Sequence, residues 1–323
     1  MTQQMQPVTA AGTAHGKSIL IGEHSVVYGA PAIAFPLHAL KVTATLTTLD
    51  NGADQAQISS AVYSGSAQSA PARLRPPLTA LREAARHFGF DPQTVHLTID
   101  SPIPVERGLG SSAAVSTAIV RAAAGLAGYD LQESERYHLV QHAERVAHGT
   151  SSGLDAHAVA SSVPLLFRDG ICRPLRSAKA LTVVIADTGN PGKTSIAVGG
   201  VRALRENNSQ LIDDLVYQLT DLTVAAETAL ANGEDTALGK ILSAAHEVLN
   251  EMGVSSPDLN NLVRAAAVAG ALGAKMTGGG LGGCIIALAP SAADAPAIAA
   301  QLTAAGAANT WVSTLDAGDQ ITD

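Results

Sequence analysis

Aromatic and charged side chains are scarce in this sequence. Phe, Trp and Tyr account for 3% of the 323 residues and charged residues for 15%, whereas 46% of the residues are hydrophobic. We therefore expect a core built mainly from Ala, Val, Leu and Ile, a composition that indicates a globular protein and excludes a disordered chain. A chain of this length fits one large domain or two ordinary ones, and two is the better expectation.

Cysteines are few and basic residues are not clustered. Cys172 and Cys284 belong to no C-x-x-C pair, so neither a disulfide framework nor a zinc site is indicated, and we expect buried free thiols. The formal net charge is −8, with 28 acidic against 20 basic residues and no run of Lys or Arg. This charge balance argues against a nucleic-acid partner.

The sequence also lacks the signals of secretion and membrane insertion. Its first residues contain neither a basic segment nor an apolar segment of a signal peptide. No stretch of about 18 uncharged apolar residues follows them. We therefore expect a cytoplasmic protein without a membrane partner.

Hydrophobic patterns predict strands and helices in both halves of the chain without strict alternation, which favours an α+β fold over a doubly wound sheet. The turn-rich segment 168–179 suggests a boundary near residue 178, giving domains 1–178 and 179–323. A further strand should follow the glycine-rich segment that begins at Thr277. The other expected strands are 18–27, 39–49, 95–99, 165–167, 181–186 and 309–315, and the expected helices are 78–88, 112–126, 131–147, 195–205, 209–231, 236–251, 258–272 and one from 291.

Two segments nearly match the phosphate loop of P-loop nucleotidases. They are Ala11–Ser18 (AGTAHGKS) and Asp187–Thr194 (DTGNPGKT), and both lack the first glycine of that motif. Lys17 is followed by a strand-like run rather than a helix, which argues against a P-loop enzyme. Because Lys17 is one of only six lysines and is close to the GEH sequence, a functional role is favoured over a solvated lysine at a strand edge.

The segment Pro104–Ala114 (PVERGLGSSAA) has the properties of an anion-binding loop. Its glycines permit backbone angles closed to other residues, its serines add hydroxyl groups, and the helix that follows directs free N–H groups and a positive dipole end toward a phosphate. An ordinary glycine turn with a serine cap is the alternative, and the whole pattern disfavours it.

Two further clusters carry polar or glycine-rich patterns. In the segment 144–155 (ERVAHGTSSGLD), Glu144 and Asp155 could face one site, one carboxylate holding a hard cation and the other an acceptor hydroxyl. A surface acid at Glu144 and a helix N-cap at Asp155 are the alternatives. The segment Lys275–Cys284 (KMTGGGLGGC) is either a second ligand-binding glycine loop or a flexible hairpin.

In this order, the clusters resemble the motifs of the GHMP kinases, and the likeness extends from about residue 12 to about residue 288. The first motif, GKSILIGEHSVVYGAPAIA, is similar to the form found in the mevalonate kinase branch. Departures occur at His15, where many members have proline, and in TSSGLD, where animal members have NPSGVD. Neither departure falls on a residue expected to do chemistry.

The resemblance implies a two-domain α+β fold, with a left-handed βαβ crossover in the N-terminal domain, a ferredoxin-like C-terminal domain and the active site between them. It also implies a role for each motif residue. Asp155 and Lys17 would be catalytic, Ser112 and Glu144 would hold Mg²⁺ with Ser111 as the other candidate serine, Glu23, His24 and Thr194 would bind substrate, and Gly108, Leu109, Gly110, Ser111, Ser112, Ala113, Gly278, Gly279 and Gly280 would surround the phosphates of ATP.

The implied reaction is ATP-dependent phosphorylation of the C5 hydroxyl of mevalonate in the mevalonate route to isoprenoids. The partners would be mevalonate and ATP, and the resemblance suggests a homodimer. Another small-molecule kinase of the family, such as a phosphomevalonate kinase, is one alternative. A catalytically silent regulator on the same fold is the other, although such a protein should have lost the residues at Lys17, Glu144 or Asp155, and all are present.

Overall fold

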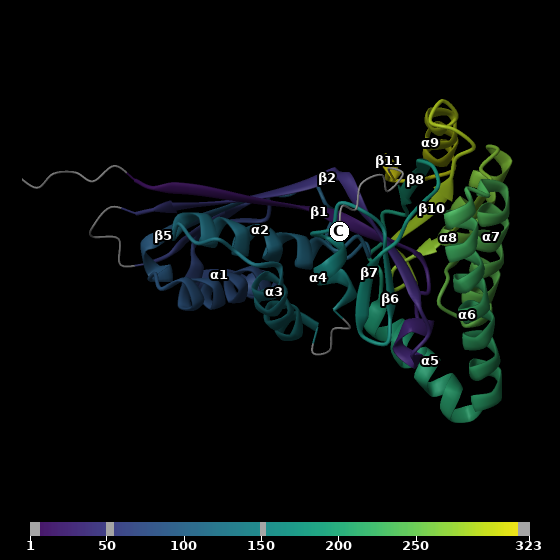
Figure 1. The fold of residues 1–323 in the computed structure, drawn as a ribbon, viewed down its shortest axis with the longest axis horizontal. Helices are drawn as coiled ribbons and strands as arrows, with labels where there is room; N and C mark the ends of the chain where they lie inside the picture. Colours follow the sequence, from purple (N-terminus) through teal and green to yellow (C-terminus); the bar gives the residue numbers. More distant parts are fainter. Residues whose placement is uncertain (1–6, 50–54, 149–152, 316–323) are drawn as a thin grey trace, which may run out of the picture. The chain divides into compact units, whose positions relative to one another are not determined.

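The structure is a computed structural model that describes residues 7–49, 55–148 and 153–315. Its internal contacts group the chain into two compact units that are interleaved in sequence (Figure 1). The first unit holds the described residues of Met1–Gly16, Leu40–Pro104 and Gly110–Ala160, and the second those of Lys17–Ala39, Val105–Leu109 and Ser161–Asp323. The domain boundary expected near residue 178 is a different division of the chain and stays a prediction.

In the first unit, helices pack together beside a sheet. The strand order is β4-β3-β5-β2, and β1 pairs with β2. Strands β3 and β5 are parallel, whereas β3 with β4 and β2 with β5 are antiparallel. Figure 1 shows α1, α2 and α3 lying together beside these strands. The bounds are β1 Thr9–Ile21, β2 Ala32–Thr48, β3 Gln57–Ser60, β4 Tyr63–Ser66, β5 Val95–Asp100, α1 Arg75–Phe88, α2 Ser111–Leu126, α3 Glu133–His148 and α4 Leu154–Ala158, with short 3-10 turns η2 Ala67–Ser69, η3 Ala72–Leu74 and η4 Pro92–Thr94.

The second unit contains an antiparallel sheet in the order β11-β8-β10-β9. Its chain order, strand, helices, two strands, helix, strand, is that of a ferredoxin-like fold. The start of β2 pairs with β6, which pairs with β7. The bounds are η1 Ser25–Tyr28, β6 Leu165–Arg168, β7 Ile171–Pro174, β8 Leu181–Asp187, β9 Gly273–Thr277, β10 Cys284–Leu288, β11 Asn309–Leu315, α5 Thr194–Asn207, α6 Ser209–Asn232, α7 Asp235–Glu251, α8 Pro257–Val268 and α9 Ala295–Ala304.

Strand β8 is the centre of the second unit's core. Every residue from Leu181 to Asp187 is buried, and β8 lies between β10 and β11, so that Ile185 is opposite both Ile286 and Trp311. A strand covered on both faces is a continuous apolar run rather than an alternating one, which is why the segment 181–186 was identifiable from sequence. The expected α+β class is confirmed, and the handedness of the crossover stays a prediction.

Several expected elements differ from the structure. The strand expected at 18–27 begins at Thr9 and ends at Ile21, because Gly22 and His24 adopt φ angles of 106° and 59° and turn the chain into η1. The short strands β3, β4 and β7 were missed, since the polar sequences QISS and YSGS carry little strand signal. The helix expected to reach 272 ends at Val268, followed by Gly270 with a φ of 87°.

The two cysteines differ in burial. Cys284 is buried as expected, but Cys172 is half-buried, so the expectation of two buried thiols is wrong for that residue. Desolvation nevertheless raises the pKa of the Cys172 thiol to about 11. In the described part of the chain, no helix is both long and apolar enough to cross a bilayer.

Two helical glycines in the second unit have opposite surroundings and give a matched test. A Cβ on Gly239 of α7 would lie 2.3 Å from the Leu272 carbonyl oxygen, whereas a Cβ on Gly200 of α5 would meet no atom within 4 Å. We expect Gly200→Ala to raise the free energy of unfolding by about 0.5–1 kcal/mol through helix propensity. Gly239→Ala should lower it by about 1–3 kcal/mol through overpacking. Urea denaturation measures both, and equal effects would contradict the close packing of α7 on β9.

Candidate active site

The predicted site residues fall in both units, and each set has its own geometry. In the second unit, Lys17 contacts the phosphate loop predicted from sequence. Its backbone N–H donates to the Leu109 carbonyl at 3.0 Å, and its Nζ donates to the Gly108 carbonyl at 3.3 Å. Lys17 is 3% exposed. The structure thus brings the predicted catalytic lysine to the first residues of the predicted phosphate loop.

The turn after β1 holds Glu23 and His24, and both side chains are buried. His24 Nε2 lies 3.1 Å from the Gly279 carbonyl. Burial, together with a smaller effect of the Lys275 charge, lowers the pKa of His24 to about 4, although the contact with Gly279 opposes the shift. The imidazole is therefore neutral near pH 7, and Nε2–H is the donor. This bond joins the first motif to the last glycine-rich motif.

Glu23 does not face solvent. Its carboxylate accepts a hydrogen bond from Nζ of Lys275 in β9, and both side chains are fully buried. The family resemblance implies a substrate-binding role for Glu23 and implies none for Lys275. Lys275 could have been noticed as a candidate because it is the first residue of the KMTGGG segment. Its position in the sequence does not, however, indicate that Glu23 is its partner.

The loop Gly278–Gly280 is held closely by its neighbours. A Cβ on Gly278 would lie 2.8 Å from Gly108 Cα, and one on Gly279 would lie 2.0 Å from the hydroxyl oxygen of Thr194, the first residue of α5. The Lys193 N–H donates to the Gly280 carbonyl at 3.0 Å. These residues therefore belong to a closely packed loop of the β9–β10 hairpin, in which Gly279 lies against Thr194. Their role in ligand binding stays a prediction.

In the first unit, helix α2 begins directly after the phosphate loop. Gly110 is its N-cap, in the left-handed conformation with φ 72°, and Ser111 is its first residue. Because a glycine cap has no side chain, it does not occupy the N–H groups of the first turn, which can bind an anion together with the positive end of the helix dipole. Ser111 and Ser112 are half-buried, and Ala113 is buried and packs the helix in place.

Ser112 and Glu144 form a direct pair. Ser112 Oγ donates to Glu144 Oε1 at 2.6 Å, and Glu144 is 3% exposed. The alternative that Glu144 is a surface acid is therefore wrong. A hydroxyl and a carboxylate oxygen suit Mg²⁺, which commonly uses one or two protein carboxylates together with substrate phosphates. The contact favours Ser112 over Ser111 as the serine that acts with Glu144.

Asp155 lies in the first turn of α4, and the alternative that it is the N-cap of this helix is wrong because Gly153 is the N-cap. The helix is anchored by Arg136, a fully buried residue that donates Nη1–H to the Ala156 carbonyl at 2.8 Å. His157, the residue after Ala156, stacks on the ring of Tyr137 with ring centroids 4.2 Å apart. Neither Arg136 nor Tyr137 was predicted from sequence, because nothing in the local pattern indicates these partners. Residues 149–152 of the predicted Ser/Gly loop lie outside the described residues.

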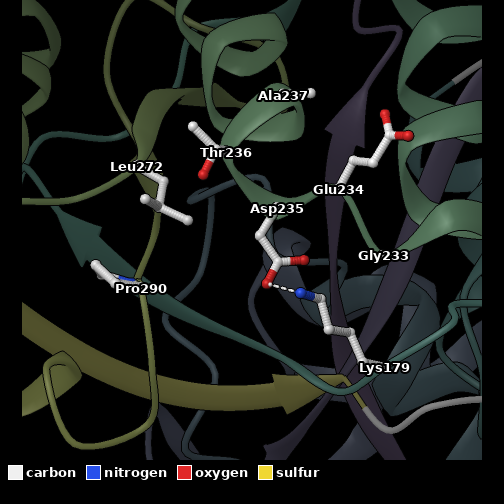
Figure 2. Close-up of a pocket in the computed structure, with 8 residues that line it drawn as sticks. All are labelled: Lys179, Gly233, Glu234, Asp235, Thr236, Ala237, Leu272 and Pro290. Carbon is white, nitrogen blue, oxygen red and sulfur yellow. Dashed lines mark ion pairs between the residues drawn. The ribbon is translucent and has the colours of Figure 1, made fainter.

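A surface pocket of about 530 Å³ in the second unit contains no predicted site residue. Figure 2 shows that it surrounds the start of α7, where Lys179 forms an ion pair with Asp235 at 2.8 Å. The positive charge of Lys179 is therefore neutralised by Asp235, another residue that lines the pocket. The lining residues are Lys179, Gly233, Glu234, Asp235, Thr236, Ala237, Leu272 and Pro290.

The neutral state of His24 predicts a loss of stability in acid. The unfolded chain protonates this residue near its ordinary pKa of 6.5, whereas the folded protein resists protonation until about pH 4. The contribution of His24 is therefore present above pH 6.5 and falls as the pH drops toward 4. In His24→Gln, which retains a donor, the loss of unfolding free energy between pH 7 and pH 5 should be smaller by about 1–2 kcal/mol. His38→Gln, at an exposed position, is the control, and equal losses in wild type and His24→Gln would contradict the prediction.

Comparisons with known proteins agree with these motifs. The model of the GHMP kinase N-terminal domain matches residues 76–162 and that of the GHMP kinase C-terminal domain matches residues 226–308. A mevalonate kinase of Thermococcus gammatolerans is 35% identical over 299 residues, covering 86% of this chain and 88% of the relative. One of Aeropyrum pernix is 33% identical over 296 residues, covering 86% and 88%.

A solved structure gives the same result for the fold. The L. major mevalonate kinase in complex with R-mevalonate has a TM-score of 0.85 and 26% identity, and the match covers 99% of this chain and 100% of that one. The two domain models match separate segments in the two halves of the chain, and the Thermococcus gammatolerans relative, at 35% identity, covers 86% of it. The chain belongs to the GHMP kinase family.

Proposed function

We propose that this protein phosphorylates the C5 hydroxyl of mevalonate with ATP, the step that yields 5-phosphomevalonate in the route to isoprenoids. The observation that carries the proposal is the contact of Lys17 with Gly108 and Leu109, which joins the GKSILIGEH motif to the phosphate loop. The substrate is inferred from relatives named mevalonate kinase at 33–35% identity over most of the chain. Cytoplasmic location and a homodimer stay predictions.

Phosphoryl transfer gains most from alignment and from neutralising the charge on the transferred group. The N–H groups at the start of α2, with Gly108–Ala113, are proposed to hold the triphosphate. Gly278–Gly280 would complete its binding through their backbone, since Gly278 packs directly against Gly108 of the phosphate loop. Lys17 would neutralise developing charge on the γ-phosphate from its buried position, where a cation acts more strongly than in water.

Ser112 and Glu144 are the residues proposed to hold Mg²⁺, through the oxygens that lie 2.6 Å apart in this structure. When bound, the ion would supply further charge neutralisation at the phosphates. Asp155 is proposed to accept the proton of the acceptor hydroxyl, and Arg136 holds its helix by the bond to Ala156. His24 and Thr194 are proposed to contact mevalonate. Glu23, which is buried against Lys275, would act on the substrate through other residues.

The function is tested by turnover with two acceptors. Purified protein with ATP and Mg²⁺ should phosphorylate mevalonate and leave phosphomevalonate unchanged in a coupled assay. Asp155→Asn should lower kcat by at least about 10² while ATP still binds, because general bases typically contribute ~10²–10⁴. Turnover of phosphomevalonate instead would establish the related kinase activity. No turnover of either acceptor would overturn the proposal, and a wild-type kcat in Asp155→Asn would remove Asp155 as the base.

The phosphate loop can be tested with a matched pair of glycines at the two ends of α2. Gly110 precedes the helix with φ 72° and Gly128 follows it with φ 65°. Alanine at either position costs about 1–2 kcal/mol of backbone strain. Only Gly110→Ala should raise the ATP KM, by about threefold or more, because it alone places a methyl group at the proposed triphosphate site. If both variants keep the wild-type ATP KM, the triphosphate binds elsewhere.

A further inference from the structure

The buried ion pair of Glu23 and Lys275 is the charged contact that the proposed mechanism leaves without a role. Lys275 is in β9, opposite Ile286 of β10, and its Nζ donates to the Glu23 carboxylate and to the Met276 carbonyl at 2.6 Å. Neither side chain is exposed. Lysine and glutamate are almost never fully buried unless paired, and here each compensates the other.

Charged and titratable groups approach this pair from several elements. Lys17 of β1 acts electrostatically on Glu23. From α7, His246 Nδ1 accepts the Met276 N–H at 3.3 Å and its Nε2 contacts Asn260 Oδ1 at 3.0 Å. Burial lowers the pKa of His246, and the Lys275 charge lowers it further. His246 and His24 are therefore neutral near pH 7, and the ionic groups around Glu23 are the two lysines.

The Glu23 carboxylate has one oxygen engaged and one available. Its Oε2 is buried and accepts no hydrogen bond from any residue that the structure describes. Burial raises the pKa of Glu23 by desolvation, and the Lys275 ammonium is the main influence that opposes this shift, with Lys17 a smaller one. The Lys275 ammonium thus favours the ionised form of Glu23 against the effect of burial, and Lys17 favours it to a smaller extent.

Stability alone gives a poor reason for such a pair. Removing two charges from water is costly, and well-packed hydrophobic residues of similar volume are often equally stable or more so. Ile286, which lies across from Lys275 in β10, is buried and apolar, so a hydrophobic side chain would fit next to it. What the charged pair does provide is a fixed position and charge for Glu23, on which Lys17 also acts electrostatically.

We propose that Lys275 is a positioning residue for phosphoryl transfer, which keeps Glu23 ionised and fixed so that Glu23 holds the Lys17 ammonium against the phosphate loop. This inference rests on the proposed function, because Lys17 is assigned to the transferred phosphate there. Lys275 itself touches neither substrate. Its effect passes through Glu23, and the arrangement of two lysines with one glutamate leaves a net positive charge for the phosphates.

Removal of the Lys275 charge tests the proposal through the pH dependence of turnover. In Lys275→Met the pKa of Glu23 should rise, because its main counter-ion is lost. Since activity requires ionised Glu23, the acidic limb of the kcat profile should move to higher pH, and kcat near pH 7 should fall by about tenfold or more while the ATP KM changes by less than about threefold. Lys275→Arg, which retains the charge, should recover most of the activity.

The double variant Glu23→Gln/Lys275→Met separates positioning from structural support. It removes both charges, so no unpaired ion stays buried, and its free energy of unfolding should be near that of the wild type. Its kcat should nevertheless remain at least about tenfold low, without the acidic shift of Lys275→Met. If the double variant has the wild-type kcat and pH profile, the pair is only structural and the proposal is overturned. This variant also decides the matter if Lys275→Met does not fold.

The two proposals fail in different ways. A wild-type protein that does not phosphorylate mevalonate removes the proposed function. A wild-type protein that does so, with Lys275→Met unchanged in kcat and in pH profile, removes only the role of Lys275.

Discussion

In the loop after β9, backbone packs directly against backbone without intervening side chains. The positions of the motif residues in the second unit depend on this close packing. A Cβ on Gly280 would lie 2.1 Å from the Val254 carbonyl oxygen, and one on Gly282 would lie 2.4 Å from that of Pro191. Main-chain bonds accompany the contacts, because the Leu281 N–H donates to Val254 and the Gly283 N–H to Asn190. Side chains at Gly280 and Gly282 would push the loop away from Val254 and from Pro191, the residue three positions before Thr194.

Small side chains also determine how closely the helices pack. Aromatics make up only 3% of the residues, and α2 buries Ala114, Ala118 and Ala122 with no exposed surface. Small side chains allow helices to approach one another and a sheet closely, so the interior gains contacts through short distances rather than large rings. The first turn of α2 is thereby fixed by its own buried residues, and it needs no capping side chain where a ligand is proposed to bind.

The sequence predicted what local patterns encode. The segment 309–315 is a strand at its predicted residues, and the expected helix at 112–126 begins one residue earlier, at Ser111. The contact of Ser112 with Glu144 was anticipated only as a shared ligand role from family resemblance. Arg136 and Lys275 could not be predicted, because each has a partner that only the folded chain brings near, at Ala156 and at Glu23. A long-range buried partner leaves no periodic or spacing signal in a single sequence.

Lysines are few in this chain, and two of them are buried. The chain has six lysines and a net charge of −8, yet Lys17 and Lys275 are buried at 3% and 0% exposure. Burial of an ammonium is costly in water-excluded surroundings, and the same low dielectric strengthens its action on nearby charge. An acidic protein that acts on a polyanion needs positive potential where the phosphates bind rather than over its surface. Lys17 is held by the backbone of the phosphate loop and Lys275 by Glu23, so the fold fixes both buried cations in place before any ligand binds.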